Sequence, residues 1–277
     1  MTLRIYGDSF AAHRPSFPGW VEFLNDRLGT DQVNWAVSGS STEFSMKKFL
    51  EDVTHNILQP NDIVIFVTST PGRLHLSFQN NIRPETASGY LHGLHTNMGQ
   101  DDSWYFQNKH HIEWLLVNQD LRLLAINHEA YVHLIKSVAH ANPDITFMLL
   151  ANTDHDFHIK GADNPPNFLT SNTYLNVIST CEYINPNHNY RDWAAHTKWD
   201  LRQNHLSNPN LKILADILFE AIQEKNLDNF TYDQFKTRFL DPVYTKSQYD
   251  NYVQNDYLYD LYSIKWFADK VPALLNG

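Results

Sequence analysis

The 277-residue chain contains almost no cysteine, since Cys181 is the only one. A single thiol excludes an intramolecular disulfide, so folding cannot depend on an oxidising compartment. It also excludes a metal site built from several thiolates. His110-His111 and the Asp- and His-rich stretch 154–158 invite a metal site, but their spacing fits no known ligand set. We therefore expect neither a metal ion nor another cofactor.

Long apolar runs are also missing. No stretch is long enough to cross a bilayer, and the N-terminus lacks the basic and apolar regions of a cleaved signal peptide. We expect a soluble protein without a membrane partner. A cytoplasmic protein and a component of a virion both fit these features.

Positive charge is in deficit. The chain has 21 Lys and Arg against 31 Asp and Glu, a formal net charge of -10, and a sequence pI of about 5.8. This balance disfavours nucleic-acid phosphates as the main partner. Hydrophobic residues make up 42% and aromatic residues 13% of the chain, which argues against disorder. Aromatic rings suit sugar faces and protein interfaces as well as a core.

Apolar segments followed by polar turns recur along the chain. The run 62–67 is almost continuously apolar and β-branched, as in strands buried on both faces of a parallel sheet. Strands are predicted at 3–6, 33–37, 62–67 and 145–150, and helices at 20–28, 44–58 and 104–141, the last as one helix or two. The alternation predicts an α/β fold, a three-layer α/β/α arrangement around a central parallel sheet. The polar turns should then line one edge of the sheet.

The other segments are less regular. The stretches 74–103 and 155–199 lack periodicity, apart from a short helix expected near 175–178, and we expect them to run over the active face. An amphipathic helix is predicted at 209–223. Beyond residue 226 the chain becomes rich in Tyr and Asp, so we divide it into a main domain, 1–226, and a C-terminal extension, 227–277.

This extension is too short for a core of its own. Helices are expected in it at 232–240 and 258–268. It should dock on the main domain or on another subunit through Tyr and Trp side chains, and in the second case it would support an oligomer or a larger assembly.

Three short motifs occur in order along the predicted α/β domain. Gly7-Asp8-Ser9 follows the first strand, where Gly7 permits backbone geometry that other residues resist. The stretch 34–39 runs through the end of the second strand into the turn at Gly39, and Asn204-His205 precedes the last helix of the domain. Together the motifs resemble the blocks of the SGNH/GDSL hydrolases, which are a Ser turn, a Gly turn, an Asn turn and a late His. The resemblance covers residues 3–225 and implies an SGNH-like, flavodoxin-like fold with a helical insertion and the C-terminal extension.

The same resemblance implies a serine esterase that needs no cofactor. Ser9 would be the nucleophile and His205 the base that takes its proton, since the ordinary pKa of histidine lies near neutrality. The backbone N–H groups of Ser9 and Gly39 would bind the oxyanion. The expected substrate is an acyl ester, with an O-acetyl group on a carbohydrate as the candidate. Any single His or Ser of this kind is more often a surface or turn residue, so the joint order of the motifs carries the prediction.

The chain departs from the family pattern in two blocks. The third strand ends in Thr68-Ser69-Thr70 where the family has Asn, so the hydroxyls of Ser69 and Thr70 and the charge of Arg73 are the candidates to face the oxyanion. The position three before His205 is Arg202, a cation, where the family has Asp. The orienting acid is therefore either Asp200, which we favour, or Asp154 at the end of the fourth strand.

These departures support an alternative of another class. The chain would keep the fold but act as a binding or structural protein, for example a virion component, with the Tyr-rich extension as an assembly surface. The observation that separates the two hypotheses is whether His205 reaches Ser9 at hydrogen-bond distance with an acid behind it.

Overall fold

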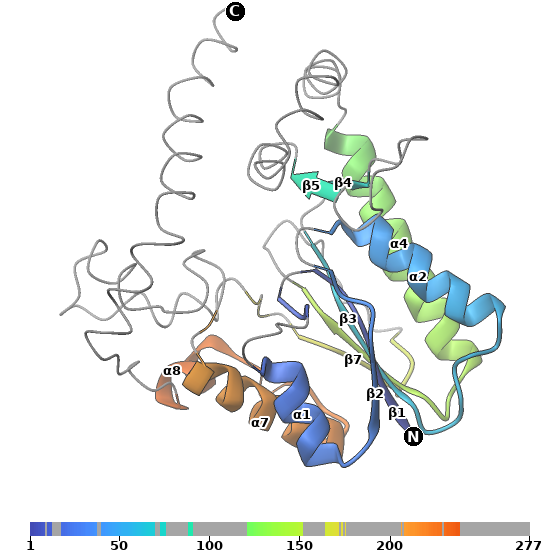
Figure 1. Cartoon of the computed structure of the whole chain (residues 1–277). Helices are drawn as coiled ribbons and strands as arrows, with labels where there is room; N and C mark the ends of the chain where they lie inside the picture. Colours follow the sequence, from blue (N-terminus) through green and yellow to red (C-terminus); the bar gives the residue numbers. More distant parts are fainter. Residues whose placement is uncertain are drawn as a thin grey trace, which may run out of the picture.

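The computed structural model describes residues 1–8, 10–12, 18–37, 40–69, 73–75, 88–90, 121–151, 164–171, 173, 175, 206, 208–228 and 230–238, and the statements below concern these residues. Their centre is a sheet of five parallel strands in the order β2-β1-β3-β6-β7 (Figure 1). The strands are β1 Thr2–Tyr6, β2 Asp31–Asn34, β3 Ile63–Val67, β6 Thr146–Leu150 and β7 Phe168–Thr170. Counted along the chain, this order is 2-1-3-4-5, which is the flavodoxin-like order of a doubly wound sheet. The predicted α/β fold is confirmed.

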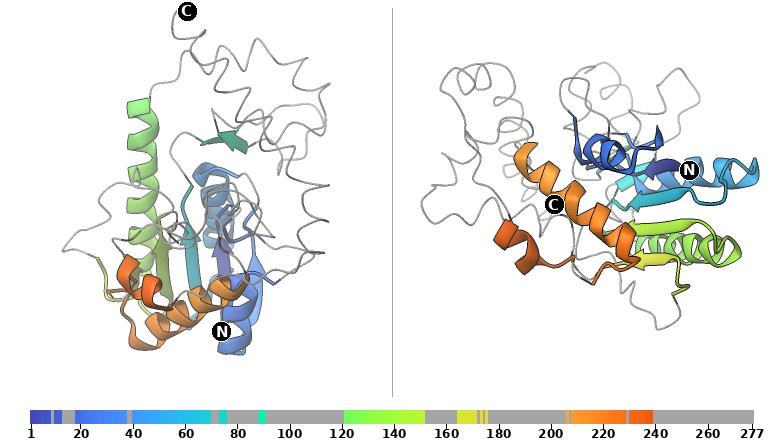
Figure 2. Two further views of the ribbon diagram at one scale, coloured as in Figure 1. Left: turned by 90° about the vertical axis from the view of Figure 1, so that its left-hand side faces the viewer. Right: turned by 90° about the horizontal axis from the view of Figure 1, so that it is seen from below.

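Helices cover both faces of the sheet (Figures 1 and 2). Helices α1 (Trp20–Leu28) and α7 (Asn208–Glu224) pack on one face, and α2 (Thr42–Thr54) and α4 (Leu121–Ala141) lie on the other. Because successive strand residues point to opposite faces, β3 supplies both cores. Its Ile63, Ile65 and Val67 join the α1–α7 core, while its Val64 and Phe66 join the α2–α4 core.

Two helices show how local signals set element ends. Helix α1 has the predicted bounds, and Gly29 ends it with a φ of 63°. Helix α2 begins two residues before the predicted start, because the hydroxyl of Ser41 caps it by accepting from the N–H of Phe44 at 3.2 Å. It ends at Thr54 rather than at 58, since Asn56 takes a left-handed φ of 54°.

The second strand is shifted from its predicted range, 33–37. The side chain of Asn34 turns back on the chain, accepting from the N–H of Ala36 at 2.9 Å and donating to the carbonyl of Ala11 at 2.7 Å. This bends the backbone out of the regular strand. The N–H groups of Trp35 and Val37 still bond the β1 side, at Ile5 and Gly7, so the segment after β2 stays alongside β1.

Two short pairings were not predicted. Strand β7 lies in the stretch expected to be irregular, and β4 (Arg73–His75) pairs antiparallel with β5 (Ser88–Tyr90) in the other. Three residues are too few to show periodicity. The side chain of Asn167 stabilises the start of β7 by bonding three carbonyls, those of Ala139, Asn142 and Ile145, at 2.8–3.0 Å.

The start of the C-terminal extension packs on the main domain. Leu227, Phe230 and Phe235 are buried in the α1–α7 core, and α8 (Tyr232–Arg238) carries Phe235. In its described part the extension thus packs on the main domain through Leu and Phe side chains, and the expected docking through Tyr and Trp stays a prediction. Most of the extension, with 258–268, lies outside the described residues, as do 104–120 and 176–178. The division at residue 226 stays a prediction.

Candidate active site

The carboxyl ends of β1 and β3 meet at the point where the sheet changes winding direction. The chain leaves β1 for β2 through α1 on one face and then crosses to β3 through α2 on the other face. In open α/β sheets, ligands bind outside the carboxyl ends of strands at such a switch point. The first and third predicted blocks follow β1 and β3 directly.

The carbonyl oxygen of Gly7 joins the first block to the second. It accepts three hydrogen bonds, from the N–H of Val37 at 3.1 Å, the hydroxyl of Ser40 at 2.9 Å and the hydroxyl of Ser45 at 3.2 Å. Val37 and Ser40 lie on either side of Ser38-Gly39 in the sequence, and Ser45 lies in the first turns of α2. The two turns that the sequence predicts as nucleophile and oxyanion blocks are therefore held to each other at their described flanks.

Gly7 also lets β1 and β3 approach closely. A Cβ atom at this position would lie 2.8 Å from Cβ and 3.2 Å from the carbonyl oxygen of Val67. Among the described glycines only Gly29 has a positive φ. The role of Gly7 is thus the close approach of two strand ends, and not the unusual backbone geometry that the sequence suggested.

We expect Gly7→Ala to destabilise the fold by about 1–3 kcal/mol, because the added methyl overpacks a buried contact with Cβ and backbone atoms. Urea unfolding measures this loss. Gly19→Ala is the matched control, since its Cβ would meet only the carboxylate of Glu22, at 3.1 Å, which can move. Equal losses in the two variants would contradict the close-approach account of Gly7.

Asp8 shapes the turn that contains Ser9 in the sequence. It is fully buried, its carboxylate accepts from the N–H of Phe10 at 3.0 Å, and its carbonyl accepts from Ala11 and Ala12. The indole N–H of Trp20 on α1 donates to the carbonyl of Phe10 at 2.6 Å. The sequence alone assigns no role to Asp8. The feature that could have predicted this role is the tendency of Asp in a turn to accept from the backbone N–H two residues later.

The third block is joined to the start of α2. One hydroxyl, that of Thr42, accepts from the N–H of Ser69 at 2.9 Å and donates to the carbonyl of Ser69 at 3.2 Å. Ser69 is 1% exposed. Its backbone N–H is thus used within the fold, and the prediction that its hydroxyl faces an oxyanion stays a prediction.

Most of the predicted site residues lie outside the described residues. These are Ser9, Gly39, Thr70, Asp154, Asp200 and His205, while Arg73 is described only as backbone in β4. Residues next to the predicted nucleophile and base are described. Phe10 and Leu206 are 8% and 4% exposed and belong to the same buried cluster, the α1–α7 core.

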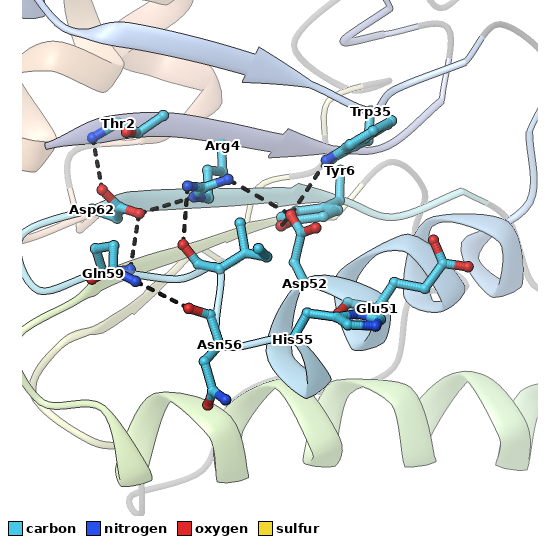
Figure 3. Close-up of polar contacts among 11 residues, drawn as sticks. Thr2, Arg4, Tyr6, Trp35, Glu51, Asp52, His55, Asn56, Gln59 and Asp62 are labelled. Carbon is cyan, nitrogen blue, oxygen red and sulfur yellow. Dashed lines mark hydrogen bonds and ion pairs between the residues drawn. The ribbon is translucent and has the colours of Figure 1, made fainter.

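A second polar group lies between β1 and α2, and Figure 3 shows its contacts. The carboxylate of Asp62 accepts from Thr2 N–H at 2.7 Å, from Nε of Arg4 at 2.9 Å and from Gln59 N–H at 3.1 Å. Burial opposes the charge of Asp62, but these hydrogen bonds outweigh burial and hold the pKa of Asp62 below its ordinary value.

Asp52 on α2 bonds the side chain at the carboxyl end of β1. Its Oδ2 atom accepts from the hydroxyl of Tyr6 at 2.6 Å and from the indole N–H of Trp35 at 3.3 Å, and lies 3.7 Å from Nη1 of Arg4. Burial, the hydrogen bond to Asp52 and its charge all raise the pKa of Tyr6 well above its ordinary value. Tyr6 therefore stays a proton donor to Asp52.

Within the described ranges no group of three His, Cys, Asp or Glu side chains could hold a metal ion. No helix of that part of the chain is long and apolar enough to cross a membrane.

The chain matches no family model, no curated protein and no solved structure. The likeness to the SGNH hydrolases thus depends on the motif residues alone.

Proposed function

We propose that the protein is a serine esterase of SGNH type that hydrolyses an acyl ester, with an O-acetyl group on a carbohydrate as the candidate substrate. One observation carries the proposal. The described flanks of the first, second and third blocks converge at the switch point of the sheet, where the carbonyl of Gly7 accepts from Val37, Ser40 and Ser45 and Gly7 lies close to Val67. Ligands bind at this place in doubly wound sheets.

In the proposed mechanism, the hydroxyl oxygen of Ser9 attacks the acyl carbonyl and its proton passes to His205. The tetrahedral oxyanion is bound by the N–H groups of Ser9 and Gly39, and each such donor is worth about 3 kcal/mol. The alcohol leaves with the proton from His205, which gives an acyl-Ser9 ester. Water activated by His205 then attacks this ester and releases the acid and the free serine.

The direct test is to incubate the full chain at pH 8 with a fluorophosphonate probe and, separately, with short p-nitrophenyl esters. The proposal expects one labelled peptide, containing Ser9, and release of p-nitrophenol. A folded protein that takes up no probe and hydrolyses none of the esters would contradict it.

For the orienting acid, we expect Asp200→Asn to reduce turnover far more than Asp154→Asn, by about 10⁴-fold if the acid fixes the tautomer of His205. The reason is that Asp200 lies only five positions before His205 in the sequence. Steady-state kinetics of both variants on the same ester measure the difference. Full activity in both would leave a Ser–His dyad, and a larger loss in Asp154→Asn would reverse the assignment.

One observation favours a second function, a binding or structural protein with the same fold. The third block lacks the family's Asn, and the backbone N–H of Ser69 is bonded to Thr42. An active site that lacks the side-chain amide of that Asn would bind an ester carbonyl more weakly. The probe experiment separates the two functions, because a binding protein takes up no fluorophosphonate.

A further inference from the structure

We propose that Asp52 is a positioning residue that holds the two turns of the candidate active site in register. The inference rests on the proposed function. Among the described residues, the Asp52 carboxylate contacts Tyr6, Trp35 and Arg4. It acts through Tyr6, which is directly followed by Gly7-Asp8-Ser9, and through Trp35, which precedes the turn at Gly39.

One carboxylate oxygen makes this link. Oδ2 of Asp52 accepts from Tyr6 on β1 at 2.6 Å and from Trp35, just after β2, at 3.3 Å, and Figure 3 shows both side chains reaching the same atom. An O–H donor to a carboxylate at this distance is among the stronger hydrogen bonds of proteins. The shared acceptor limits any sliding of the end of β2 against the end of β1.

Packing and hydrogen bonds hold both donors of the link. The Tyr6 ring is fully buried, with its centroid 5.4 Å from that of Phe49 and 5.9 Å from that of Phe66. Trp35 is 39% exposed, but its indole N–H is bonded to Asp52 and the Lys48 ammonium lies 5.3 Å from its ring centroid. Arg4 supplies the opposite charge that a nearly buried Asp52 requires.

Helix α2 therefore contacts the strand ends at two levels. Near its start, Ser45 bonds the carbonyl of Gly7, and near its end Asp52 bonds the side chains of Tyr6 and Trp35. Residues held this way by a supporting shell keep a reacting geometry within the narrow limits that catalysis needs.

Asp62 is the matched comparison within the same polar group. It bonds Thr2, Arg4 and Gln59, at the amino end of β1 and in the loop before β3. Within the part of the chain that the structure describes, the side chain of Asp62 bonds neither Tyr6 nor Trp35. A carboxylate that merely stabilises the fold should behave like Asp62, whereas a positioning carboxylate should not.

The experiment compares Tyr6→Phe, Asp52→Asn and Asp62→Asn with the wild type. It measures the rate of fluorophosphonate labelling in samples that are fully folded at the assay temperature, the melting temperature, and the ¹⁵N-resolved resonances of the Trp35 indole and of the Gly7 and Val37 amides. Tyr6→Phe keeps the ring packing and loses only the hydroxyl, so it remains informative if Asp52→Asn folds poorly.

We expect Tyr6→Phe and Asp52→Asn to shift these resonances and to slow labelling by about tenfold or more, since small misplacements of reacting groups have effects of this size. Asp62→Asn should lower the melting temperature and leave the labelling rate of folded protein unchanged. Normal labelling in both Asp52 and Tyr6 variants would overturn the proposal.

A wild type that takes up no probe would refute the proposed esterase, and the resonances would then decide the positioning role. Shifts at Gly7 and Val37 in the Asp52 variant but not in the Asp62 variant support the link between the two turns. Unchanged amides in the Asp52 variant overturn it.

Discussion

Replacement of Ser9 by alanine should abolish fluorophosphonate labelling and reduce ester hydrolysis by about 10⁴- to 10⁶-fold, because removal of a serine nucleophile has losses of this order. The free energy of unfolding should change little, since a single turn hydroxyl contributes little packing. Labelling with mass-spectrometric mapping, ester kinetics and urea unfolding on the same preparations measure the three quantities. The same variant leaves the oxyanion N–H groups in place, so a residual rate above that of water is expected.

Ser137→Ala is the control for this experiment. Ser137 is an exposed serine on α4 that donates to the carbonyl of His133, far along the sequence from every motif block. It should label and hydrolyse as the wild type does. In the wild type, labelling should fall as the pH is lowered and the imidazole of His205 becomes protonated, because a protonated ring cannot accept the serine proton. Labelling that persists in Ser9→Ala would place the nucleophile elsewhere.

The sheet could be predicted from the sequence because its central strands are recognisable as apolar runs. Strand β3 is apolar at every position, since both of its faces are covered by helices, and its predicted and observed bounds differ by one residue. Strand β2 could not be bounded in this way. Its end is set by the side chain of Asn34, whose two hydrogen bonds depend on where Ala11 lies in space.

The candidate site was likewise predicted in part. The order of the motifs predicted that turns after different strands would share one edge of the sheet, and the described flanks of these turns do so. The hydroxyls that bind the turns together were not predicted. The sequence places Ser40 in a polar turn and begins the next helix at residue 44, and it gives no sign that Ser40, Thr42 and Ser45 bond Gly7 and Ser69. These bonds depend on the spatial arrangement of the strand ends.

The buried polar side chains around Arg4 and Asp62 were not predicted, for a related reason. Arg4 alternates with Leu3 and Ile5, a pattern that suggests a strand with one solvent-exposed face. The strand order places β1 between two other strands with helices on both faces, so Arg4 is 7% exposed and requires a partner. That partner, Asp62, lies 58 positions away in the sequence.

Asp62→Ala should cost about 3–5 kcal/mol of unfolding free energy, because removing one partner of a buried ion pair leaves the other charge uncompensated. Among the described residues, Arg4 would keep the carbonyl of Ile57 at 3.1 Å and the more distant carboxylate of Asp52. The N–H groups of Thr2 and Gln59 would lose their acceptor as well. Urea unfolding at pH 7 measures the loss.

The exposed pair between Arg238 and Glu220 is the matched control. It is also an Arg–carboxylate contact, with two hydrogen bonds at 2.8 and 3.1 Å, but its side chains are 32% and 54% exposed. Glu220→Ala should therefore cost less than about 1 kcal/mol. Similar losses in the two variants would mean that burial does not set the strength of the Arg4–Asp62 pair.

The pH dependence gives an independent check on the same carboxylate. The folded-state pKa of Asp62 lies below its ordinary value of 3.8, so the folded protein binds this proton less readily than the unfolded chain does. The contribution of Asp62 to stability is thus fully present above pH 3.8 and is lost as the pH falls through the folded-state pKa. The difference in unfolding free energy between the wild type and Asp62→Asn, measured at a series of pH values, should be constant near neutrality and shrink in acid. A difference that grows as the pH falls would mean that the carboxyl of Asp62 is held protonated in the fold, and would contradict the charged pair with Arg4.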